Sequence, residues 1–369
     1  MLSALIVGAC VGLASSWQVS GASPRFFVKS DGSVLASGGN SPDMLPGYEW
    51  RTVPAVNFAR LSLPGPVRQI DATTSQVLAL MTDGTVLAWG SSAHSILGPG
   101  VGRTSQPTPL AGLEDIVQVG IGWNHAAALR SDGKVLTWGQ HTYGVLGDGK
   151  DDDKEDGSPK VVSGLTDVTA ISVGGRSTLV LRKDGTVWAW GCNSVGQLGQ
   201  GTTGRCIATP VQVKGLQKVR QISADKNDNG ANAAITSDGK VWVWGGNSSS
   251  MLGNGKRDGF ASVPVAVKGV TGAKQVAVGL GFIVVVHTDG TVTNWGFNGF
   301  GGLGIGKTGG YNMSPQKPKV SGIASAFPSG YATFLVKTNG ALLWSGSGDG
   351  SKTGPMSKKV SKFTALTIP

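Results

Sequence analysis

The chain has 369 residues, 40% of them hydrophobic and 15% charged, so it can bury a full core and lacks the composition of a disordered protein. Its 59 glycines are about twice the usual share and indicate many tight turns. The formal charge of +10 reflects few acids more than many bases, and no run interleaves bases with aromatics, so a solvated basic surface is favoured over nucleic-acid binding.

The N-terminus reads MLSALIVGACVGLASS, an apolar stretch of secretory-signal length ending in small residues, although no Lys or Arg precedes it. We expect residues 1–16 to be a signal peptide or N-terminal segment, residues 17–369 to be a single domain, and the protein to be secreted or periplasmic. Val7-Gly8-Ala9-Cys10 also resembles a lipoprotein cleavage box in which Cys10 would carry lipid. If residues 4–9 are instead a buried strand, the protein is cytoplasmic. The segment is too short to span a bilayer.

A unit of about 50 residues then repeats seven times along the chain. Each copy is marked by a turn dipeptide: Asp-Gly at Asp31, Asp83, Asp132, Asp184, Asp238 and Asp289, and Asn-Gly at Asn339. A Trp-Gly pair follows six residues later in five copies, at Trp89, Trp138, Trp190, Trp244 and Trp295. The slot is Ser37 in the first copy, and Trp344 comes one residue early in the last. A leucine follows eight residues after the slot in six copies: Leu45, Leu97, Leu146, Leu198, Leu252 and Leu303.

Each unit has the pattern of a four-stranded antiparallel sheet. Two β-rich runs joined through Asp-Gly form the strongest local hairpin signal. Another strand-like run precedes the hairpin, for example residues 115–119, and a fourth begins at a proline after the Leu-Gly loop, for example residues 210–213 and 264–267.

Both faces of these sheets must be covered. Val187-Trp188-Ala189-Trp190 and Val241-Trp242-Val243-Trp244 place apolar side chains on both sides of the pleat. Seven sheets arranged radially cover one another, so we predict an all-β, seven-bladed β-propeller of four-stranded blades with the recurrent Trp wedged between neighbouring blades. For ring closure we favour residues 360–368 as the inner strand of the first sheet, with residues 17–20 as the competitor.

The joint pattern of D-G-x-[VL]-x-x-W-G, a following L-G-x-G and an upstream G-x-x-H slot resembles the regulator of chromosome condensation repeat family. The resemblance covers the chain from about residue 17 and implies a seven-bladed propeller that binds macromolecular partners through loops at one face. Family members include a nucleotide-exchange factor for a small GTPase, a plant ultraviolet receptor and secreted bacterial inhibitors of β-lactamases. They share a scaffold and not an activity.

The chain departs from the family at the upstream slot, where only Gly122-Trp123-Asn124-His125 keeps the full motif. The other copies have Pro24, Gln76, Ser177, Ala231, Phe282 and Ala332 there. No residue of the exchange factor's working face is carried over, and a photoreceptor is disfavoured. With the apparent signal, the resemblance points to the secreted bacterial type and to alpha-tubulin suppressor-like repeat proteins.

Chemistry-bearing residues are sparse. None of the four histidines stands in a nucleophile motif or at a zinc spacing, so we expect no catalysis and no cofactor. His141 occupies a slot where other copies have Asn, which suggests a hydrogen-bonding role within a loop. Residues 225–230 match the opening of a calcium loop, which makes Asp225, Asn227 and Asn229 a weak metal candidate because Thr236 stands where a bidentate Glu is needed. Residues 150–156 carry charge without ligand geometry and predict an exposed tip.

Cys192 and Cys206 close a short loop and are a disulfide candidate in an oxidising compartment.

The loops before the second strand and those carrying Leu-Gly should share one face, opposite the Asp-Gly hairpins, and form a binding platform. Our candidate partner-binding residues are Trp123, Asn124, His125, Tyr143, Arg176, Phe282, Phe300 and Tyr331. Phe282 and Tyr331 have the alternative of packing the channel wall. The leading hypothesis is a monomeric, non-enzymatic scaffold that binds a protein partner. The alternatives are a propeller associated with chromatin or nucleic acid, or an exchange-factor-like regulator, and a propeller holding a small ligand or sugar in its channel.

Overall fold

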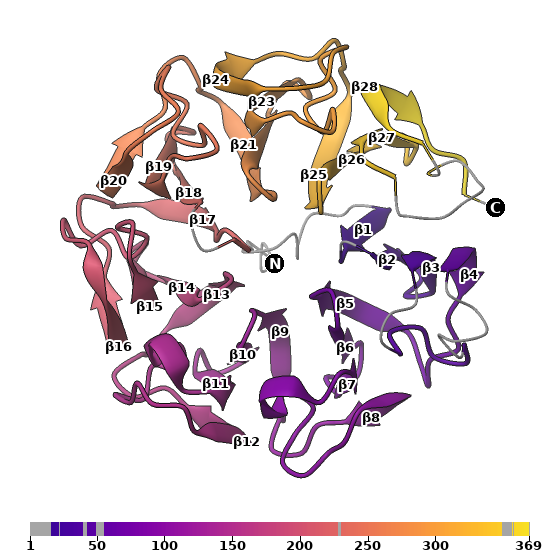
Figure 1. The fold of residues 1–369 in the computed structure, drawn as a ribbon, viewed down its shortest axis with the longest axis vertical. Coiled ribbons are helices and arrows are strands. Elements are labelled where there is room, and N and C mark those ends of the chain that lie inside the picture. The colour runs from indigo at the N-terminus through magenta and orange to yellow at the C-terminus, as the bar shows by residue number, and fades with distance from the viewer. Residues whose placement is uncertain are drawn as a thin grey trace, which may run out of the picture.

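The computed structural model describes residues 16–21, 23–39, 43–48, 55–227, 230–348, 356 and 358–368. Within these ranges the chain forms seven four-stranded antiparallel sheets, arranged around a central opening as in Figure 1. The predicted seven-bladed β-propeller is therefore confirmed. Residues 1–15 of the expected signal peptide, Cys10 included, lie outside the described ranges. None of the described helices is long and apolar enough to cross a membrane.

Each blade runs from an inner strand at the channel to an outer strand at the rim. Blade 1 consists of β1 (Trp17–Ser20), β2 (Arg25–Lys29), β3 (Val34–Gly39) and β4 (Ala55–Arg60). Blade 2 consists of β5 (Val67–Ala72), β6 (Gln76–Met81), β7 (Val86–Gly90) and β8 (Thr104–Pro109). Blade 3 consists of β9 (Ile116–Ile121), β10 (His125–Arg130), β11 (Val135–Gln140) and β12 (Glu155–Val161). Blade 4 consists of β13 (Val168–Val173), β14 (Ser177–Arg182), β15 (Val187–Asn193) and β16 (Gly204–Gln212).

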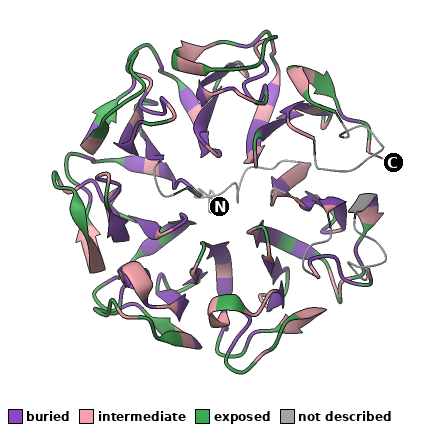
Figure 2. Ribbon diagram, in the orientation of Figure 1, coloured by how far each residue is buried: buried purple, intermediate pink, exposed green. Residues whose placement is uncertain are grey.

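Blade 5 consists of β17 (Val219–Ser223), β18 (Ala231–Thr236), β19 (Val241–Gly246) and β20 (Phe260–Ala266). Blade 6 consists of β21 (Ala273–Val278), β22 (Phe282–His287), β23 (Val292–Phe297) and β24 (Tyr311–Gln316). Blade 7 consists of β25 (Ile323–Ser329), β26 (Ala332–Lys337), β27 (Leu342–Gly346) and β28 (Val360–Ala365), and two single turns of 3-10 helix are η1 (Ala93–Ser95) and η2 (Thr142–Gly144). Figure 2 shows that burial is concentrated in the inner three strands and that the outer strands and loops carry the exposed residues.

The recurrent Asp organises each hairpin between the second and third strands. Its Oδ1 accepts a hydrogen bond from the backbone N–H two residues on, at 2.8 Å from Ser33 and 2.9 Å from Thr85 and Thr186. Hydrogen bonds from the hydroxyls of Ser33 and Thr186, followed by these backbone bonds, lower the pKa of Asp31 and Asp184, and the backbone bond from Thr85 is the main cause that lowers the pKa of Asp83. The turn therefore needs an Asx side chain as well as the positive φ that Gly provides.

The recurrent Trp is the wedge between blades that the sequence predicts. Trp89, Trp138, Trp190, Trp244 and Trp295 are each 0% exposed. Each indole Nε1 donates to a carbonyl in the third-to-fourth-strand loop of the preceding blade, for example from Trp138 to Ile96 O at 2.9 Å and from Trp190 to Val145 O at 2.8 Å. Burial and a buried hydrogen bond therefore act on the same contact between blades.

The Gly after each Trp permits a close approach of two chain segments. Gly139 and Gly191 have φ values of 123° and 106°. A Cβ added there would lie 2.4 Å from Asn124 O and 2.5 Å from Arg176 O. Only glycine fits, because the loop after the inner strand packs directly against the end of the third strand.

Glutamines on the inner strands form clamps that the sequence analysis did not anticipate. Gln69 Nε2 donates to Val119 O at 2.8 Å, and Gln69 Oε1 accepts from Val119 N at 3.1 Å. The same pair of bonds joins Gln118 to Ile171, Gln221 to Val276 and Gln275 to Ala326. Each clamp satisfies both groups of a backbone unit facing the neighbouring blade, so it fixes the spacing of inner strands around the channel.

Ring closure differs from the favoured expectation. The inner strand of blade 1 is β1, and the C-terminal segment forms β28, the outer strand of blade 7. The physical reason is burial: β28 has the largely exposed pattern of the other outer strands, whereas residues 17–20 continue the inner-strand pattern of Gln followed by an apolar residue. Each end of the chain thus completes its own blade.

Blades 1 and 7 are consequently held together by packing. Phe27 stacks edge-on against Phe334, with ring centroids 5.4 Å apart. Arg25, 1% exposed, donates from Nε to Ser329 Oγ at 3.3 Å and from Nη2 to Ser347 O at 3.2 Å. A buried guanidinium and an aromatic pair therefore connect the two blades without a shared sheet.

The outer strands begin earlier than their prolines suggest. β16 starts at Gly204 and β20 at Phe260, so Pro210 and Pro264 lie within strands and not at their starts. Both sit where the register shifts against the third strand, between Ala189 and Gly191 and between Val243 and Gly245. A bulge on an edge strand tolerates proline because no ladder hydrogen bond is lost there.

Candidate functional site

Two sets of loops emerge on the same face of the propeller, as the antiparallel topology requires. We call this the loop face: it carries the connections between first and second strands and between third and fourth strands of every blade. The Asp-Gly turns lie on the opposite side, which we call the hairpin face. The platform expected from the sequence is therefore present as an arrangement of loops.

Trp123, Tyr143 and Arg176 come together on the loop face, at the boundary of blades 3 and 4. Arg176 Cζ lies 5.0 Å from the ring centroid of Trp123 and 4.3 Å from that of Tyr143. Trp123 is 41% exposed, and Asn124 beside it donates from Nδ2 to Gln140 Oε1 at 2.8 Å. We call Trp123, Tyr143 and Arg176 the Arg176 cluster; its guanidinium is held between two aromatic faces.

His125 and Phe282 do not reach this surface, so their assignment to an exposed platform was wrong. His125 is 0% exposed and Phe282 1% exposed. The residues at the same slot in the other copies, Pro24, Gln76, Ser177, Ala231 and Ala332, are buried too. The slot where the family often has His is therefore a packing position in this chain.

The environment of His125 follows from that burial. Its Nε2 lies 2.9 Å from Thr178 Oγ1 in the next blade. Burial, with a smaller contribution from the positive charge of Lys226, lowers the pKa of His125 to about 3. The imidazole is neutral at physiological pH and serves as a link between blades.

Phe300 and Tyr331 lie on the loop face within a larger aromatic group. Their rings stack at a centroid distance of 4.7 Å and an interplanar angle of 28°. Phe297 lies beneath them, 6.0 Å from Phe300 and 5.7 Å from Tyr331, and its ring is 5.4 Å from Tyr311. We call Phe297, Phe300, Tyr311 and Tyr331 the aromatic patch. It joins the third-to-fourth-strand loop of blade 6 to the first loop of blade 7.

Two cations border the aromatic patch from the neighbouring loops. Arg257 Cζ lies 3.9 Å from the centroid of Tyr311, and Arg257 Nη2 donates to the Tyr311 hydroxyl at 3.0 Å. Lys359 Nζ lies 5.7 Å from the centroid of Phe300. Sequence reasoning missed Phe297, Tyr311, Arg257 and Lys359, because these residues come from three blades and only the radial packing brings them together.

The central channel contains a cavity of about 390 Å³. Its lining combines small apolar and hydroxyl residues of all seven inner strands with one ion pair, between Lys226 Nζ and Asp71 Oδ2 at 2.7 Å. Lys226 Nζ also donates to Ile121 O at 2.6 Å, so this side chain of blade 5 reaches blades 2 and 3. No histidine or cysteine is among the described residues that line the cavity.

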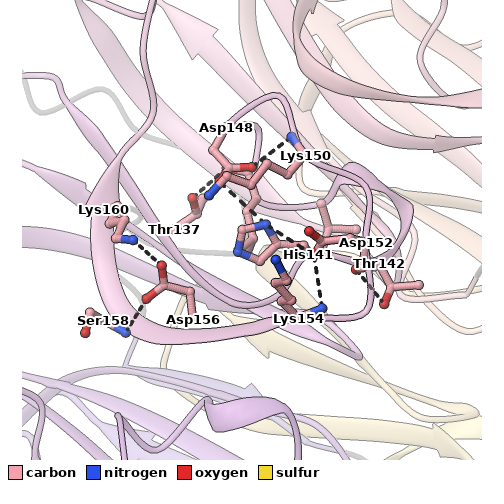
Figure 3. A network of polar contacts seen from close by, with 12 residues as sticks. Thr137, His141, Thr142, Asp148, Lys150, Asp152, Lys154, Asp156, Ser158 and Lys160 are labelled. Carbon is pink, nitrogen blue, oxygen red and sulfur yellow. Dashed lines mark hydrogen bonds and ion pairs between the residues drawn. The ribbon is translucent and has the colours of Figure 1, made fainter.

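The charged loop of blade 3 is largely exposed, as expected, and Figure 3 shows the polar contacts among its side chains. His141, 3% exposed, has its Nδ1 3.6 Å from Asp148 Oδ2 and 3.9 Å from Asp152 Oδ1. Asp152 and Asp156 also accept backbone N–H groups of Lys154 and Ser158, at 3.0 and 3.2 Å. The carboxylates thus stabilise local turns, whereas Nδ1 of His141 has no hydrogen-bond partner among the described residues, so the hydrogen-bonding role expected of His141 is not found at that atom.

The other candidates gain no ligand geometry. Asp225 is 4% exposed and its backbone N–H donates to Asn232 Oδ1 at 3.0 Å; Asn229 lies outside the described residues. In the described part of the chain no group of three or more His, Cys, Asp or Glu is placed to hold a metal ion.

Cys192 and Cys206 are free thiols, so the structure does not contain the candidate disulfide. Burial, together with the neighbouring Cys192, raises the pKa of Cys206 to about 12. Its thiol is therefore held in the protonated, unreactive form.

The amino-acid sequence of this chain is similar to those of known proteins. The family model described as RCC1-like domain matches residues 14–335. The E3 ubiquitin-protein ligase HERC2 of Mus musculus is 30% identical over 303 residues, which cover 79% of this chain and 6% of HERC2. Protein pim1 of Schizosaccharomyces pombe is 31% identical over 233 residues, which cover 57% of this chain and 42% of pim1. The chain therefore spans less than half the length of these curated relatives.

Solved structures share the fold. Human WBSCR16 superimposes with a TM-score of 0.74 at 21% identity, covering 87% of this chain and 86% of that one. Prp20p of Saccharomyces cerevisiae gives a TM-score of 0.72 at 22% identity, covering 84% of this chain and 79% of that one. HERC2, pim1, WBSCR16 and Prp20p are eukaryotic, so these matches do not support the expected likeness to secreted bacterial members.

Proposed function

Because this chain belongs to the family of RCC1-like domains, we propose that it is a non-enzymatic binding scaffold that engages a protein partner through its loop face. The proposal depends on one observation above all: aromatic and arginine side chains gather there. Trp123, Phe300 and Tyr331 are 41%, 39% and 38% exposed, and arginines lie against the aromatic groups that contain them. Tyr, Trp and Arg supply most of the binding energy at protein interfaces.

The surroundings favour binding over catalysis. The channel cavity holds one ammonium group and one carboxylate among its described lining residues, and these neutralise each other across 2.7 Å. His125 is buried and its lowered pKa places it far from the range of a general base at neutral pH. A rigid ring of loops is typical of a docking platform.

Relatives of the same fold lend support. The structure of yeast Prp20p, also called yeast RCC1, was reported together with its binding properties to Gsp1p and histones, and the same protein was solved with Kap60 bound. A protein that shares this fold therefore binds other proteins.

The test is capture of the partner from an extract of the organism that encodes the chain, with quantification by mass spectrometry. The wild type is compared with a variant that carries Trp123→Ala, Tyr143→Ala, Phe300→Ala and Tyr331→Ala. A control variant carries Lys134→Ala, Lys183→Ala and Lys240→Ala on the hairpin face. We expect a protein that is captured by the wild type and the control and lost from the loop-face variant. Loss confined to the hairpin-face variant would contradict the proposal.

A chromatin-associated or exchange-factor-like regulator is the second candidate, and the charge of +10 and the likeness to Prp20p, which was reported to bind histones, favour it. It predicts binding to duplex DNA that weakens steeply between 50 and 200 mM salt, on the order of a thousandfold for six phosphate contacts. Salt-independent or absent DNA binding would contradict the hypothesis that this protein binds nucleic acid.

We further propose that the protein is exported; the N-terminal mass of the mature protein is the measurement that decides this.

A further inference from the structure

The aromatic patch presents two stacked rings on a well-packed base. Phe300 and Tyr331 are exposed, while Phe297 and Tyr311 beneath and beside them are half-buried. Contacts with Phe297 from both upper rings hold the pair in place. An apolar side chain of a partner could therefore bury surface here without first ordering the site, which lowers the entropic cost of binding.

The cations beside the patch have no acidic partner among the residues that the structure describes. Arg257 contacts the Tyr311 ring and hydroxyl, and Lys359 Nζ donates to Gly299 O at 3.0 Å. Among the described residues neither side chain has a carboxylate within 4.0 Å. Each keeps its full charge toward solvent, with donors left for a further acceptor.

The loops around the patch are cationic as a group. Their described residues, in the ranges 247–259, 298–310, 330–331, 347–348 and 358–359, include Lys256, Arg257, Lys307, Lys358 and Lys359 but only one acid, Asp258. The loop of blade 3 has the opposite bias, with Asp148, Asp151, Asp152 and Asp153 against Lys150 and Lys154. The loop face therefore carries charge of opposite sign at blade 3 and at blades 5–7.

We infer that the aromatic patch binds an acidic polypeptide segment that carries one aromatic or large aliphatic anchor residue. The anchor packs on Phe300 and Tyr331, and flanking carboxylates pair with Arg257 and Lys359. This inference rests on the proposed function and specifies the partner chemistry for one part of the loop face. Charge complementarity favours this part of the loop face over the acidic loop of blade 3 for such a segment.

The direct test measures binding of labelled peptides to the full chain by fluorescence anisotropy. The probe is a fluorescein-labelled 16-residue peptide of Glu, Ser and Gly with one central Phe. Three comparison probes are the same peptide with Ser in place of Phe, the same peptide with Lys in place of Glu, and a single-stranded oligonucleotide of equal charge. We expect the Phe-containing acidic peptide to bind at least about tenfold more tightly than any of the three.

Variants locate the contact. Phe300→Ala and Tyr331→Ala should each weaken binding of the Phe-containing acidic peptide about tenfold. Arg257→Glu with Lys359→Glu should weaken it further and abolish its salt dependence. The matched controls are Phe260→Ala, an aromatic residue 55% exposed on β20, and Lys134→Glu with Lys183→Glu, which make the same charge change on the hairpin face. Both controls should bind as the wild type.

The inference is overturned if the anchorless peptide binds equally well, if the oligonucleotide binds more tightly than the acidic Phe peptide, or if the controls lose as much affinity as the patch variants. Partner capture can also contradict this inference while leaving the proposed function in place. That result is a loss of capture with Trp123→Ala and Tyr143→Ala and unchanged capture with Phe300→Ala and Tyr331→Ala. Capture that maps to the hairpin face would instead remove the proposed function.

Discussion

Replacement of Trp190 by Phe tests how the blades are held together. The change removes the Nε1 donor that lies 2.8 Å from Val145 O and part of a side chain that is 0% exposed. An unpaired buried carbonyl costs about 1–3 kcal/mol. The lost ring atoms leave a cavity that adds about 1–2 kcal/mol. We therefore expect Trp190→Phe to lower the free energy of unfolding by about 3 kcal/mol.

Trp188 provides a matched control on the same strand. It lies two residues away on the same face of β15, is half-buried, and donates from Nε1 to Thr186 Oγ1 at 3.3 Å. Trp188→Phe should cost less than about 1 kcal/mol, because water replaces the lost partner. Urea unfolding followed by far-UV circular dichroism gives both values from the shift of the midpoint. Equal shifts for the two variants, or a cost below about 1 kcal/mol for Trp190→Phe, would refute this explanation of the repeat.

Three further predictions concern closure, pH and the thiols. Phe27→Ala should lower the free energy of unfolding by about 3–5 kcal/mol in the same assay, whereas the control Phe260→Ala should change it by less than about 0.5 kcal/mol. Similar values for the two variants would mean that the contact between blades 1 and 7 does not depend on packing. Burial holds the pKa of His125 at about 3 in the folded protein, whereas a histidine in the unfolded chain has its ordinary pKa of about 6.5. Between these two values the unfolded chain binds one proton more than the folded protein, so stability falls as the pH drops from about 6.5 to about 3. His125→Gln should reduce this slope by up to about 1.4 kcal/mol per pH unit, and an unchanged slope from pH 7 to pH 4 contradicts the prediction. Because the pKa of Cys206 is raised to about 12, its alkylation at pH 8 should be much slower in the native protein than in urea, and a peptide map showing a bond to Cys192 would contradict the free thiols.

The repeat made the fold readable because each signal is local. Asp31 and its equivalents fix a turn within four residues, and Trp138 and its equivalents mark the strand after it. Closure was not readable in this way, since the choice between residues 17–20 and 360–368 depends on which strand is buried against two neighbours. The inner-strand glutamines were present as a weak second signal, at Gln69 and Gln118.

The site was only partly predictable for the same reason. Trp123, Tyr143 and Arg176 stand in loops whose face follows from topology, and the structure brings them together. His125 was misplaced because motif position says nothing about whether a side chain points outward. The aromatic patch depends on contacts between residues of different blades, for example Arg257 with Tyr311, and no spacing in one repeat encodes them.

Hydrogen exchange of the complex with the captured partner tests most directly whether the loop face, and its aromatic patch, is the docking surface. We predict that partner binding slows exchange in residues 298–310 and 329–331 and leaves the Asp-Gly turns unchanged. Protection confined to those turns on the hairpin face, with no change in residues 298–310, would contradict the account.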